Sequence, residues 1–255
     1  MASKIAAQLY TVRHACQEAG EMAASLQKVA DIGYEAVQLS GHGKDIQSEE
    51  IKQMCDDAGL TICATHTSYE RMRDDLAGVV EEHQLYECTY PGIGGLPAEY
   101  RESGEGFAQF AREASEVAKR LAEHGLVFVY HNHSFELEKF GDRTGLQILL
   151  EESDPEYFMF EPDTYWLQHG GASPVAWLRR MGSRAPVVHF KDMAMSGREQ
   201  LFAEIGEGNL DWEGIIAACE DAGSEWYIVE QDTCQRDAFE SLKISFDNMR
   251  AMGIE

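Results

Sequence analysis

Short apolar runs alternate along the chain with longer segments in which apolar residues recur at helical spacing. Short apolar runs are typical of buried parallel strands, and recurrence every three or four residues is typical of a helix packed on one face. This pattern predicts strands at 4–12, 35–40, 60–68, 86–93, 126–132, 157–162, 187–191 and 226–230. It predicts helices at 22–32, 47–58, 71–85, 107–124, 145–152, 175–181, 212–222 and 238–252. A strand is therefore followed by a helix eight times.

Regular alternation of this kind predicts a parallel sheet that is covered by helices. The chain has 255 residues, a length at which eight such units close into one α/β barrel. We therefore expect the α/β class and a single (β/α)8 TIM barrel, with one domain over residues 1–255. An open doubly wound sheet is the alternative. It is disfavoured because the segment after the first strand, TVRHACQ, lacks the glycine-rich turn of that fold.

The charge and the apolar pattern restrict the partners. Forty-five acidic residues against 21 basic ones give a formal net charge of −24, which would repel a nucleic acid. No apolar run is long enough to span a membrane. The opening MASKIAAQLY has no long apolar signal region, and the six cysteines have no paired spacing. These features predict a cytoplasmic protein with reduced thiols that binds neither nucleic acid nor membrane.

Polar residues stand where several of the predicted strands end, and in a barrel these ends meet at one mouth. The residues are His66, His131, His133, Glu136, Glu161, Asp163, His189, Lys191, Asp192, Glu230 and Asp232. Such side chains are costly in a core unless they are paired or bind a metal. Carboxylates and imidazoles without thiols suit a divalent ion such as Mn²⁺, Mg²⁺, Co²⁺ or Zn²⁺. Any one of them could be structural, but their recurrence on four consecutive strands indicates a shared site.

Several motifs resemble the xylose-isomerase-like TIM-barrel superfamily of sugar phosphate isomerases and epimerases. They are AAQLYTVR, GYEAVQLSG, YHNHSFE, EPDTYW, VVHFKD, FAEIGEGNLDW and WYIVEQD, and they follow one another over nearly the whole chain. The resemblance implies a metal held at the ends of strands five to eight, commonly by Glu, Asp, His and Glu. Carried over by motif, the last three ligands are Asp163, His189 and Glu230.

The first ligand departs from the family pattern. Many family epimerases have a Glu where this chain has His131. We expect Glu136, five residues further on, to fold back and supply the carboxylate, and the alternative is that His131 or His133 binds the metal. The choice matters because family epimerases use two Glu residues on opposite faces of the substrate as acid and base.

The resemblance implies a metal-dependent isomerase or epimerase that removes a proton next to the carbonyl of a sugar or keto-sugar and forms an enediolate. Glu230 is a candidate base, and Glu136 or His131 is its candidate counterpart. Lys191 is expected either to neutralise the enediolate or to form a salt bridge with Asp192 or Glu230.

Further residues are expected at the mouth of the barrel. Hydrogen bonds to substrate hydroxyls are expected from Gln8, Tyr10, His66 and His133. Trp166 is expected either to stack on a sugar face or to belong to the core. No dedicated cluster of basic residues marks a phosphate site, so we expect a substrate without phosphate.

Other functions are compatible with the same barrel fold. A metal-dependent dehydratase or lyase, acting on an inosose-like or 3-keto-sugar substrate, would start with the same proton abstraction. A non-catalytic sugar-binding barrel is less expected, because Asp163, His189 and Glu230 are all present. The net charge of −24 disfavours an endonuclease that acts on abasic sites. By analogy with relatives of this fold, a homo-oligomer is possible.

Overall fold

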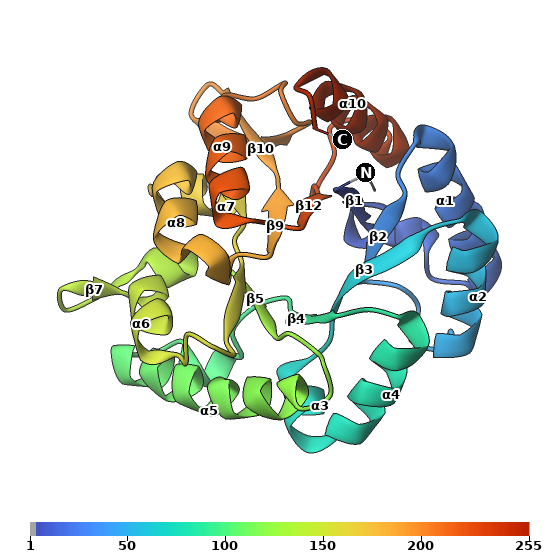
Figure 1. Ribbon diagram of the computed structural model, residues 1–255. Coiled ribbons are helices and arrows are strands. Elements are labelled where there is room, and N and C mark those ends of the chain that lie inside the picture. Colours follow the sequence, from blue (N-terminus) through green and yellow to red (C-terminus); the bar gives the residue numbers. More distant parts are fainter. Residues whose placement is uncertain (1–3, 255) are drawn as a thin grey trace.

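Eight parallel strands form a ring at the centre of the molecule, and helices surround them (Figure 1). The computed structural model describes residues 4–254. The ring consists of β1 (Ile5–Gln8), β2 (Ala36–Leu39), β3 (Thr61–His66), β4 (Tyr90–Ile93), β5 (Val129–His131), β8 (Met159–Glu161), β9 (Val187–Phe190) and β12 (Trp226–Val229). Each strand pairs with its neighbour in chain order, and β12 pairs with β1. Between β8 and β9 the pairing is reduced to one bridge, Asp163 with His189, so the barrel is nearly closed.

Ten α-helices are described in the same residues. They are α1 (Ala19–Ile32), α2 (Ser48–Ala58), α3 (Tyr69–Asp74), α4 (Leu76–Tyr86), α5 (Gly104–Ala122), α6 (Gly145–Glu152), α7 (Thr164–His169), α8 (Pro174–Met181), α9 (Trp212–Ala222) and α10 (Ala238–Ala251). The order of strands and helices confirms the predicted (β/α)8 barrel. The domain predicted over 1–255 includes residues 1–3 and 255, which lie outside the described part. None of the described helices is both long and apolar enough to cross a membrane.

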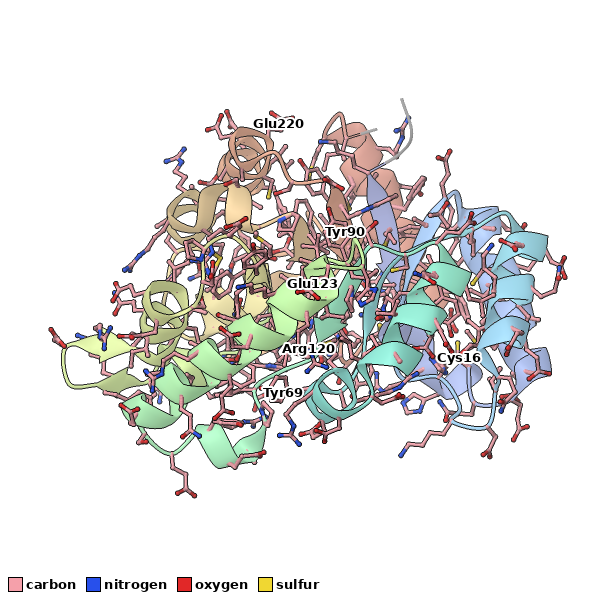
Figure 2. All side chains as sticks on the ribbon, turned by 60° about the horizontal axis from the view of Figure 1, so that its bottom comes forward. Cys16, Tyr69, Tyr90, Arg120, Glu123 and Glu220 are labelled. Carbon is pink, nitrogen blue, oxygen red and sulfur yellow. The ribbon has the colours of Figure 1, made fainter. Side chains whose placement is uncertain are left out.

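Helix α5 illustrates why the segments between the strands are helical. Ser103 caps its start, because the Ser103 hydroxyl accepts a hydrogen bond from the backbone N–H of Gly106 at 3.1 Å. Phe107 and Phe110 are buried against the barrel, whereas Arg120 is exposed near the end of the helix (Figure 2). One apolar stripe on a helix is what holds it to the sheet.

Two apolar clusters fill the core. The larger packs between the strands and the helices. The smaller gathers residues from several strands and lies inside the barrel, and its members are Ala6, Ala36, Cys63, Ala64, Tyr90, Val129, Val187 and Ile228. Because successive residues of a strand point alternately outward and inward, most strands supply both clusters, and β8 contributes the partly buried Met159 to the smaller one.

Three predicted elements were wrong in part. The fourth strand begins at Tyr90 rather than at residue 86, and Tyr86 is the last residue of α4. The first strand ends at Gln8 rather than at residue 12, and the 3-10 helix η1 (Leu9–Ala15) follows it. The side chain of Gln8 accepts a hydrogen bond from the N–H of Tyr10 at 3.2 Å and so caps that turn. The helix predicted over 71–85 is two helices. Asp75 has a non-helical backbone, ends α3, and accepts a hydrogen bond from the N–H of Gly78 that caps α4.

Several short elements after the strands were not predicted. Helix α7 follows β8, and the hairpin of β10 (Asp192–Ser196) and β11 (Glu199–Ala203) occupies part of the connection after β9. A second hairpin, β6 (Lys139–Phe140) with β7 (Arg143–Thr144), follows β5 and the 3-10 helix η3 (Phe135–Leu137). Two further 3-10 turns are η2 (Ala98–Tyr100) and η4 (Gly182–Arg184).

The connection after β9 is organised around the carboxylate of Asp192, which is fully buried. Its oxygens accept hydrogen bonds from the backbone N–H groups of Gly206 at 2.9 Å, Gly208 at 3.1 Å and Leu210 at 3.2 Å. The indole Nε1 of Trp212 donates a further bond at 2.7 Å. A Cβ on Gly208 would collide with the Asp192 carboxylate, so glycine is required there. One side chain therefore fixes the loop that leads from β11 to α9.

We predict that Asp192→Ala lowers the free energy of unfolding by at least about 3 kcal/mol, because several buried N–H groups lose their shared acceptor. Urea unfolding followed by circular dichroism measures the effect. The exposed Asp221 of α9 provides the control, and Asp221→Ala should change the same free energy by less than about 0.5 kcal/mol. A loss below about 1 kcal/mol for Asp192→Ala would show that the loop does not depend on this carboxylate.

Candidate functional site

The barrel interior becomes polar toward the C-terminal ends of the strands. Every second side chain of a strand points into the barrel, and the inward position that follows the last apolar one carries a polar side chain. These polar residues are Gln8, Gln38, His66, His131, Glu161, His189 and Glu230. Pairing of neighbouring strands sets Gln8 beside Gln38 and His131 beside Glu161. The register of the barrel therefore collects residues that lie far apart in the sequence.

Four of the buried residues at this end offer one ligand atom each, and these atoms all lie within 4.8 Å of one another. They are His131, Asp163, His189 and Glu230. Nε2 of His131 lies 3.0 Å from Oδ2 of Asp163. Nδ1 of His189 lies 2.9 Å from Oε2 of Glu230 and 3.7 Å from Oδ2 of Asp163. Atoms that share one ion at about 2.1 Å lie roughly 3 to 4 Å apart, so these separations suit a common metal.

Two observations support the fit to a divalent ion. Nδ1 of His189 is buried and makes no hydrogen bond in the described part of the chain, which is costly for a polar atom, whereas Oε2 of Glu230 is compensated by the ammonium of Lys191 at 2.7 Å. The donors are two imidazoles and two carboxylates, a set that suits Zn²⁺, Mn²⁺ or Co²⁺. The residues at this end of the barrel therefore fit a metal of the expected kind.

His131 is oriented as a metal ligand should be. Its Nε2 faces Oδ2 of Asp163 at 3.0 Å, and its Nδ1 lies 3.4 Å from the carbonyl oxygen of Gly94, which could accept the ring proton if an ion bound Nε2. Burial, together with the nearby charge of His189, lowers the pKa of His131 below its ordinary value. The ring is then neutral, which is the form that binds metals.

Lys191 is a buried cation next to the four-residue group. Its ammonium lies 2.7 Å from Oε2 of Glu230, 3.0 Å from Oδ2 of Asp163 and 2.9 Å from Oδ2 of Asp232. Burial alone would lower the pKa of Lys191, but the charges of these carboxylates outweigh it and raise that pKa. Likewise, burial opposes ionisation of Glu230, yet Lys191 and His189 hold the Glu230 pKa well below its usual range. Of the two predicted salt bridges, the contact with Glu230 forms, and the Asp192 oxygens are engaged elsewhere.

A second group, His66, Glu161 and His189, also has close ligand atoms. Here the atoms already bond to one another. Nε2 of His66 lies 2.7 Å from Oε2 of Glu161, and Nε2 of Gln38 donates to Oε1 of Glu161 at 2.7 Å. A set of satisfied atoms has no need of an ion, so the first group is the better metal site.

Glu136 is not part of the four-residue group, contrary to our expectation. Its carboxylate is fully buried and accepts hydrogen bonds from the Tyr130 hydroxyl at 2.7 Å and from the backbone N–H of His133 at 2.9 Å. The 3-10 turn η3 directs the side chain toward Tyr130, away from the mouth of the barrel. His131, the alternative, occupies the fourth position.

A polar cavity of about 230 Å³ opens beside the four-residue group. It is lined by Tyr10, Ser40, His66, Gly94, His131, His133, Lys191, Glu230 and Asp232. Three of the expected substrate contacts, Tyr10, His66 and His133, therefore face this space. Ser40 and Gly94 were not predicted, although Ser40 also ends an apolar run, at the close of β2.

Two other expected substrate contacts lie elsewhere. Gln8 is fully buried and donates a hydrogen bond to Gln38 at 2.7 Å, beneath the cavity. Trp166 is not among the lining residues. Its ring lies 5.3 Å from that of His133 and 5.7 Å from the ammonium of Lys191, so it stands behind the wall of the cavity.

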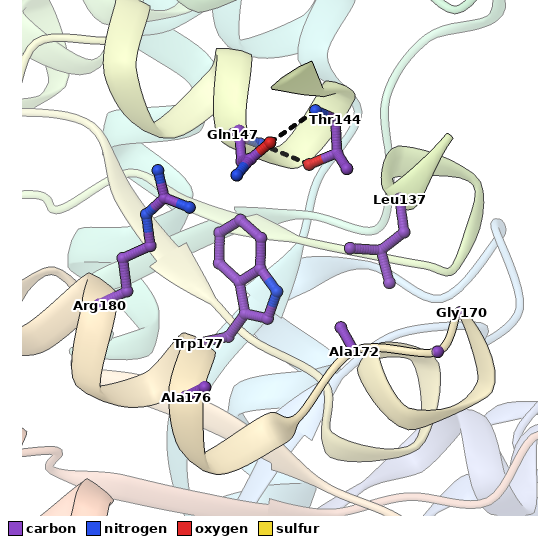
Figure 3. Close-up of a pocket in the computed structure, with 9 residues that line it drawn as sticks. Leu137, Thr144, Gln147, Gly170, Ala172, Ala176, Trp177 and Arg180 are labelled. Atoms are coloured by element: carbon purple, nitrogen blue, oxygen red, sulfur yellow. Dashed lines mark hydrogen bonds between the residues drawn. The ribbon is translucent and has the colours of Figure 1, made fainter. Parts of the chain in front are cut away.

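A second cavity, of about 310 Å³, lies outside the barrel beside α6 and α8 (Figure 3). Thr144 and Gln147 on its wall bond to each other in the cap of α6. The guanidinium of Arg180 is paired with Glu151 at 2.7 Å. No imidazole or carboxylate is among the described residues that line this cavity, so it offers none of the chemistry of the barrel mouth.

We predict that Glu136 makes stability depend on pH. Burial raises the pKa of Glu136 from 4.5 to about 7. Between these values the unfolded chain releases a proton that the folded chain retains, so stability falls by about 3 kcal/mol as pH rises through this window. Glu136→Gln removes this dependence, and its amide can still bond Tyr130 and His133.

Urea unfolding at pH 5, 6, 7 and 8 measures the difference between the wild type and Glu136→Gln. The exposed Glu138 provides the matched control, and Glu138→Gln should follow the wild-type pH curve. A difference between Glu136→Gln and the wild type that stays constant at all four pH values would contradict the raised pKa.

Comparison with solved structures supports the fold. The chain is similar to a sugar phosphate isomerase/epimerase from Parabacteroides distasonis, with a TM-score of 0.82, 23% identity, and coverage of 100% of this chain and 96% of that one. It is also similar to an L-ribulose 3-epimerase, with a TM-score of 0.73, 13% identity, and coverage of 99% and 95%. At these identities the likeness concerns the fold alone.

Sequence comparison gives a curated relative and a family. The chain is 27% identical over 175 residues to an inosose dehydratase of Mesomycoplasma hyopneumoniae strain 7448. The match covers 57% of this chain and 54% of the relative, so it spans about half the length of that protein. The profile of the xylose isomerase-like TIM barrel family matches residues 26–252. This protein belongs to the xylose isomerase-like TIM barrel family.

Proposed function

We propose that this protein is a divalent-metal-dependent enzyme that removes a proton next to the carbonyl of a small sugar-like ketone. The observation that carries the proposal is the carboxylate of Glu230, which belongs to the four-residue group and also lines the polar cavity. Lys191 and His189 keep Glu230 ionised, which is the form that can accept a proton. Because they also weaken it as a base, the proton beside the carbonyl would have to be made more acidic by the ion. A divalent ion in this group would polarise the carbonyl and stabilise the negative charge of the enediolate.

The residues around the cavity suit a small polyhydroxylated molecule. Tyr10, His66 and His133 bring hydroxyl and imidazole groups to a space of about 230 Å³, which is small for a ligand site. Lys191 is the one Lys or Arg among the described lining residues, and three carboxylates already surround its ammonium. This supports a substrate without a phosphate group.

The arrangement of bases favours dehydration as the outcome. Epimerisation at one carbon needs proton-transferring groups on both faces of the substrate. Here His131 stands where many family epimerases have a carboxylate, and the oxygens of Glu136 face Tyr130 and His133. Loss of a hydroxyl from the carbon next to the enediolate can work with one base, because the proton that the base has taken can pass to the leaving hydroxyl and release it as water. The curated relative is named an inosose dehydratase. We therefore favour dehydration of a cyclic keto-polyol.

Isomerisation between a ketose and an aldose is the second candidate. It also works with one base, because the same carboxylate can return the proton to the neighbouring carbon. The similar solved structures include a sugar phosphate isomerase/epimerase and an L-ribulose 3-epimerase, which keeps this reaction close to the first. The small-molecule partner, the possible homo-oligomer and the cytoplasmic location stay predictions.

The reaction is tested with the Mn²⁺-loaded protein, keto-inositols and common ketoses in D₂O, followed by NMR. We expect deuterium at the carbon beside the carbonyl and a product that has lost water. Glu230→Gln should lower turnover by about 1,000-fold or more, because it removes the base. Glu220, exposed on α9 (Figure 2), gives the control, and Glu220→Gln should leave turnover unchanged. Near-normal turnover of Glu230→Gln would refute its role, and deuterium without loss of water would favour isomerisation.

Metal binding is tested by calorimetric titration of the chelator-treated protein with Mn²⁺ and Zn²⁺. We expect one ion per chain. His131→Ala should weaken its binding by about 100-fold or more, because a ligand is lost. Glu136→Gln should change the affinity by less than about twofold, because its carboxylate faces Tyr130. Absence of binding to the wild type would refute the proposed metal-dependent function.

A further inference from the structure

Glu161 is a buried carboxylate that has no role in the proposed reaction. It is 0% exposed, ends β8, and lies one inward-facing position below Asp163. It does not line the cavity. A buried carboxylate is costly unless hydrogen bonds and opposite charges compensate it. The contacts that compensate Glu161 therefore indicate what it does.

Both oxygens of Glu161 face histidine nitrogens. Oε1 lies 3.1 Å from Nε2 of His189, and Oε2 lies 2.7 Å from Nε2 of His66. Ionised carboxylates only accept hydrogen bonds, so each of these two nitrogens carries a proton. The two rings come from β9 and β3, and Glu161 joins them beneath the mouth of the barrel.

Gln38 also favours a proton on Nε2 of His189. Its Oε1 lies 2.6 Å from Nε2 of His189, and its Nε2 donates to Oε1 of Glu161. Gln8 donates to the same Oε1 of Gln38 at 2.7 Å. A flipped Gln38 amide would set its NH₂ group against that of Gln8 and its oxygen against Glu161, so the orientation of Gln38 is fixed. Nε2 of His189 therefore meets two acceptors.

Because Nε2 keeps its proton, Nδ1 of His189 is the ring atom at which an ion would replace a proton. This Nδ1 is the atom that lies 2.9 Å from Oε2 of Glu230 and has no hydrogen-bond partner among the described residues. The second nitrogen of a metal-binding histidine commonly donates to a carboxylate, which fixes the ring and makes it a stronger donor.

We propose that Glu161 is a positioning residue for the metal centre: with Gln38 it holds the proton of His189 on Nε2 and so presents Nδ1 to the ion. This inference rests on the proposed metal site. Glu161 acts in the same way on His66. The Nδ1 of His66 lies 3.1 Å from where a Cβ of Gly94 would stand, at the cavity wall. With its proton on Nε2, His66 offers Nδ1 as an acceptor for a substrate hydroxyl.

The first test is the metal affinity of Glu161→Met, measured by calorimetric titration with Zn²⁺. Methionine has about the length of glutamate but removes both acceptor oxygens, so Nε2 of His189 loses this acceptor. We expect the affinity to fall by about 10- to 100-fold. The matched control is Glu204→Met. Glu204 is also a buried carboxylate, but it bonds Ser241 and Arg236 away from the four-residue group, and its loss should not change the affinity.

His66→Gln separates this proposal from a metal in the second group. It removes the other partner of Glu161 without touching a ligand of the first group, so we expect Zn²⁺ affinity within about twofold of the wild type. A large loss of affinity in His66→Gln would place the ion between His66, Glu161 and His189, and would overturn the positioning role.

A second measurement needs no variant. In the wild-type protein with Zn²⁺, long-range ¹H–¹⁵N spectra of the histidine rings should show His189 bound through Nδ1 with its proton on Nε2. Zinc on Nε2 of His189, or unchanged affinity in Glu161→Met, overturns the inference while the proposed function stands. Failure of the wild type to bind Zn²⁺ or Mn²⁺ overturns the proposed function and this inference with it.

Discussion

Compensation of buried charge inside the barrel is the constraint on which the rest of the site depends. Three fully or almost fully buried carboxylates, Glu161, Asp163 and Glu230, share this interior with the one ammonium of Lys191. Imidazoles at His66, His131 and His189 stand between them. Carboxylates so enclosed require cations or donors at close range. The interior therefore has two layers. In the lower layer, hydrogen-bond donors surround Glu161. In the upper layer, Asp163 and Glu230 belong to a group that fits a cation.

The alternation of strand side chains explains how much of this could be predicted. Asp163, His189 and Glu230 each follow an apolar run, and the parallel order of the strands brings them to one end, so the sequence sufficed for three of the four residues. Gln38 also carried a signal. It lies between Val37 and Leu39 in a buried strand, and an inward-facing amide there needs a partner. That partner, Glu161, is fixed only by the register of the closed barrel.

The features that were missed depend on side-chain contacts that neither helical nor strand periodicity encodes. Whether His131 or Glu136 joins the four-residue group is decided by the turn after β5 and by the hydroxyl of Tyr130. The hairpin of β10 and β11 is likewise fixed at its base by Asp192, whose donors lie 14 to 20 residues further along. Short elements of this kind contain too few residues for hydrophobic periodicity to be recognised. The long apolar stripe of α5, in contrast, was predicted with little error.

The presence of His131 changes the electrostatics of the site. The common family set of Glu, Asp, His and Glu has three carboxylates and would leave a divalent ion with a net charge of −1. The set of His131, Asp163, His189 and Glu230 has two carboxylates, so the same assembly is neutral. A less negative centre attracts electrons from a carbonyl oxygen more strongly. With a divalent ion bound there, the position that lacks a second carboxylate base would gain stabilisation of the enediolate, which supports the proposed loss of a hydroxyl, a reaction that needs one base and a stabilised anion.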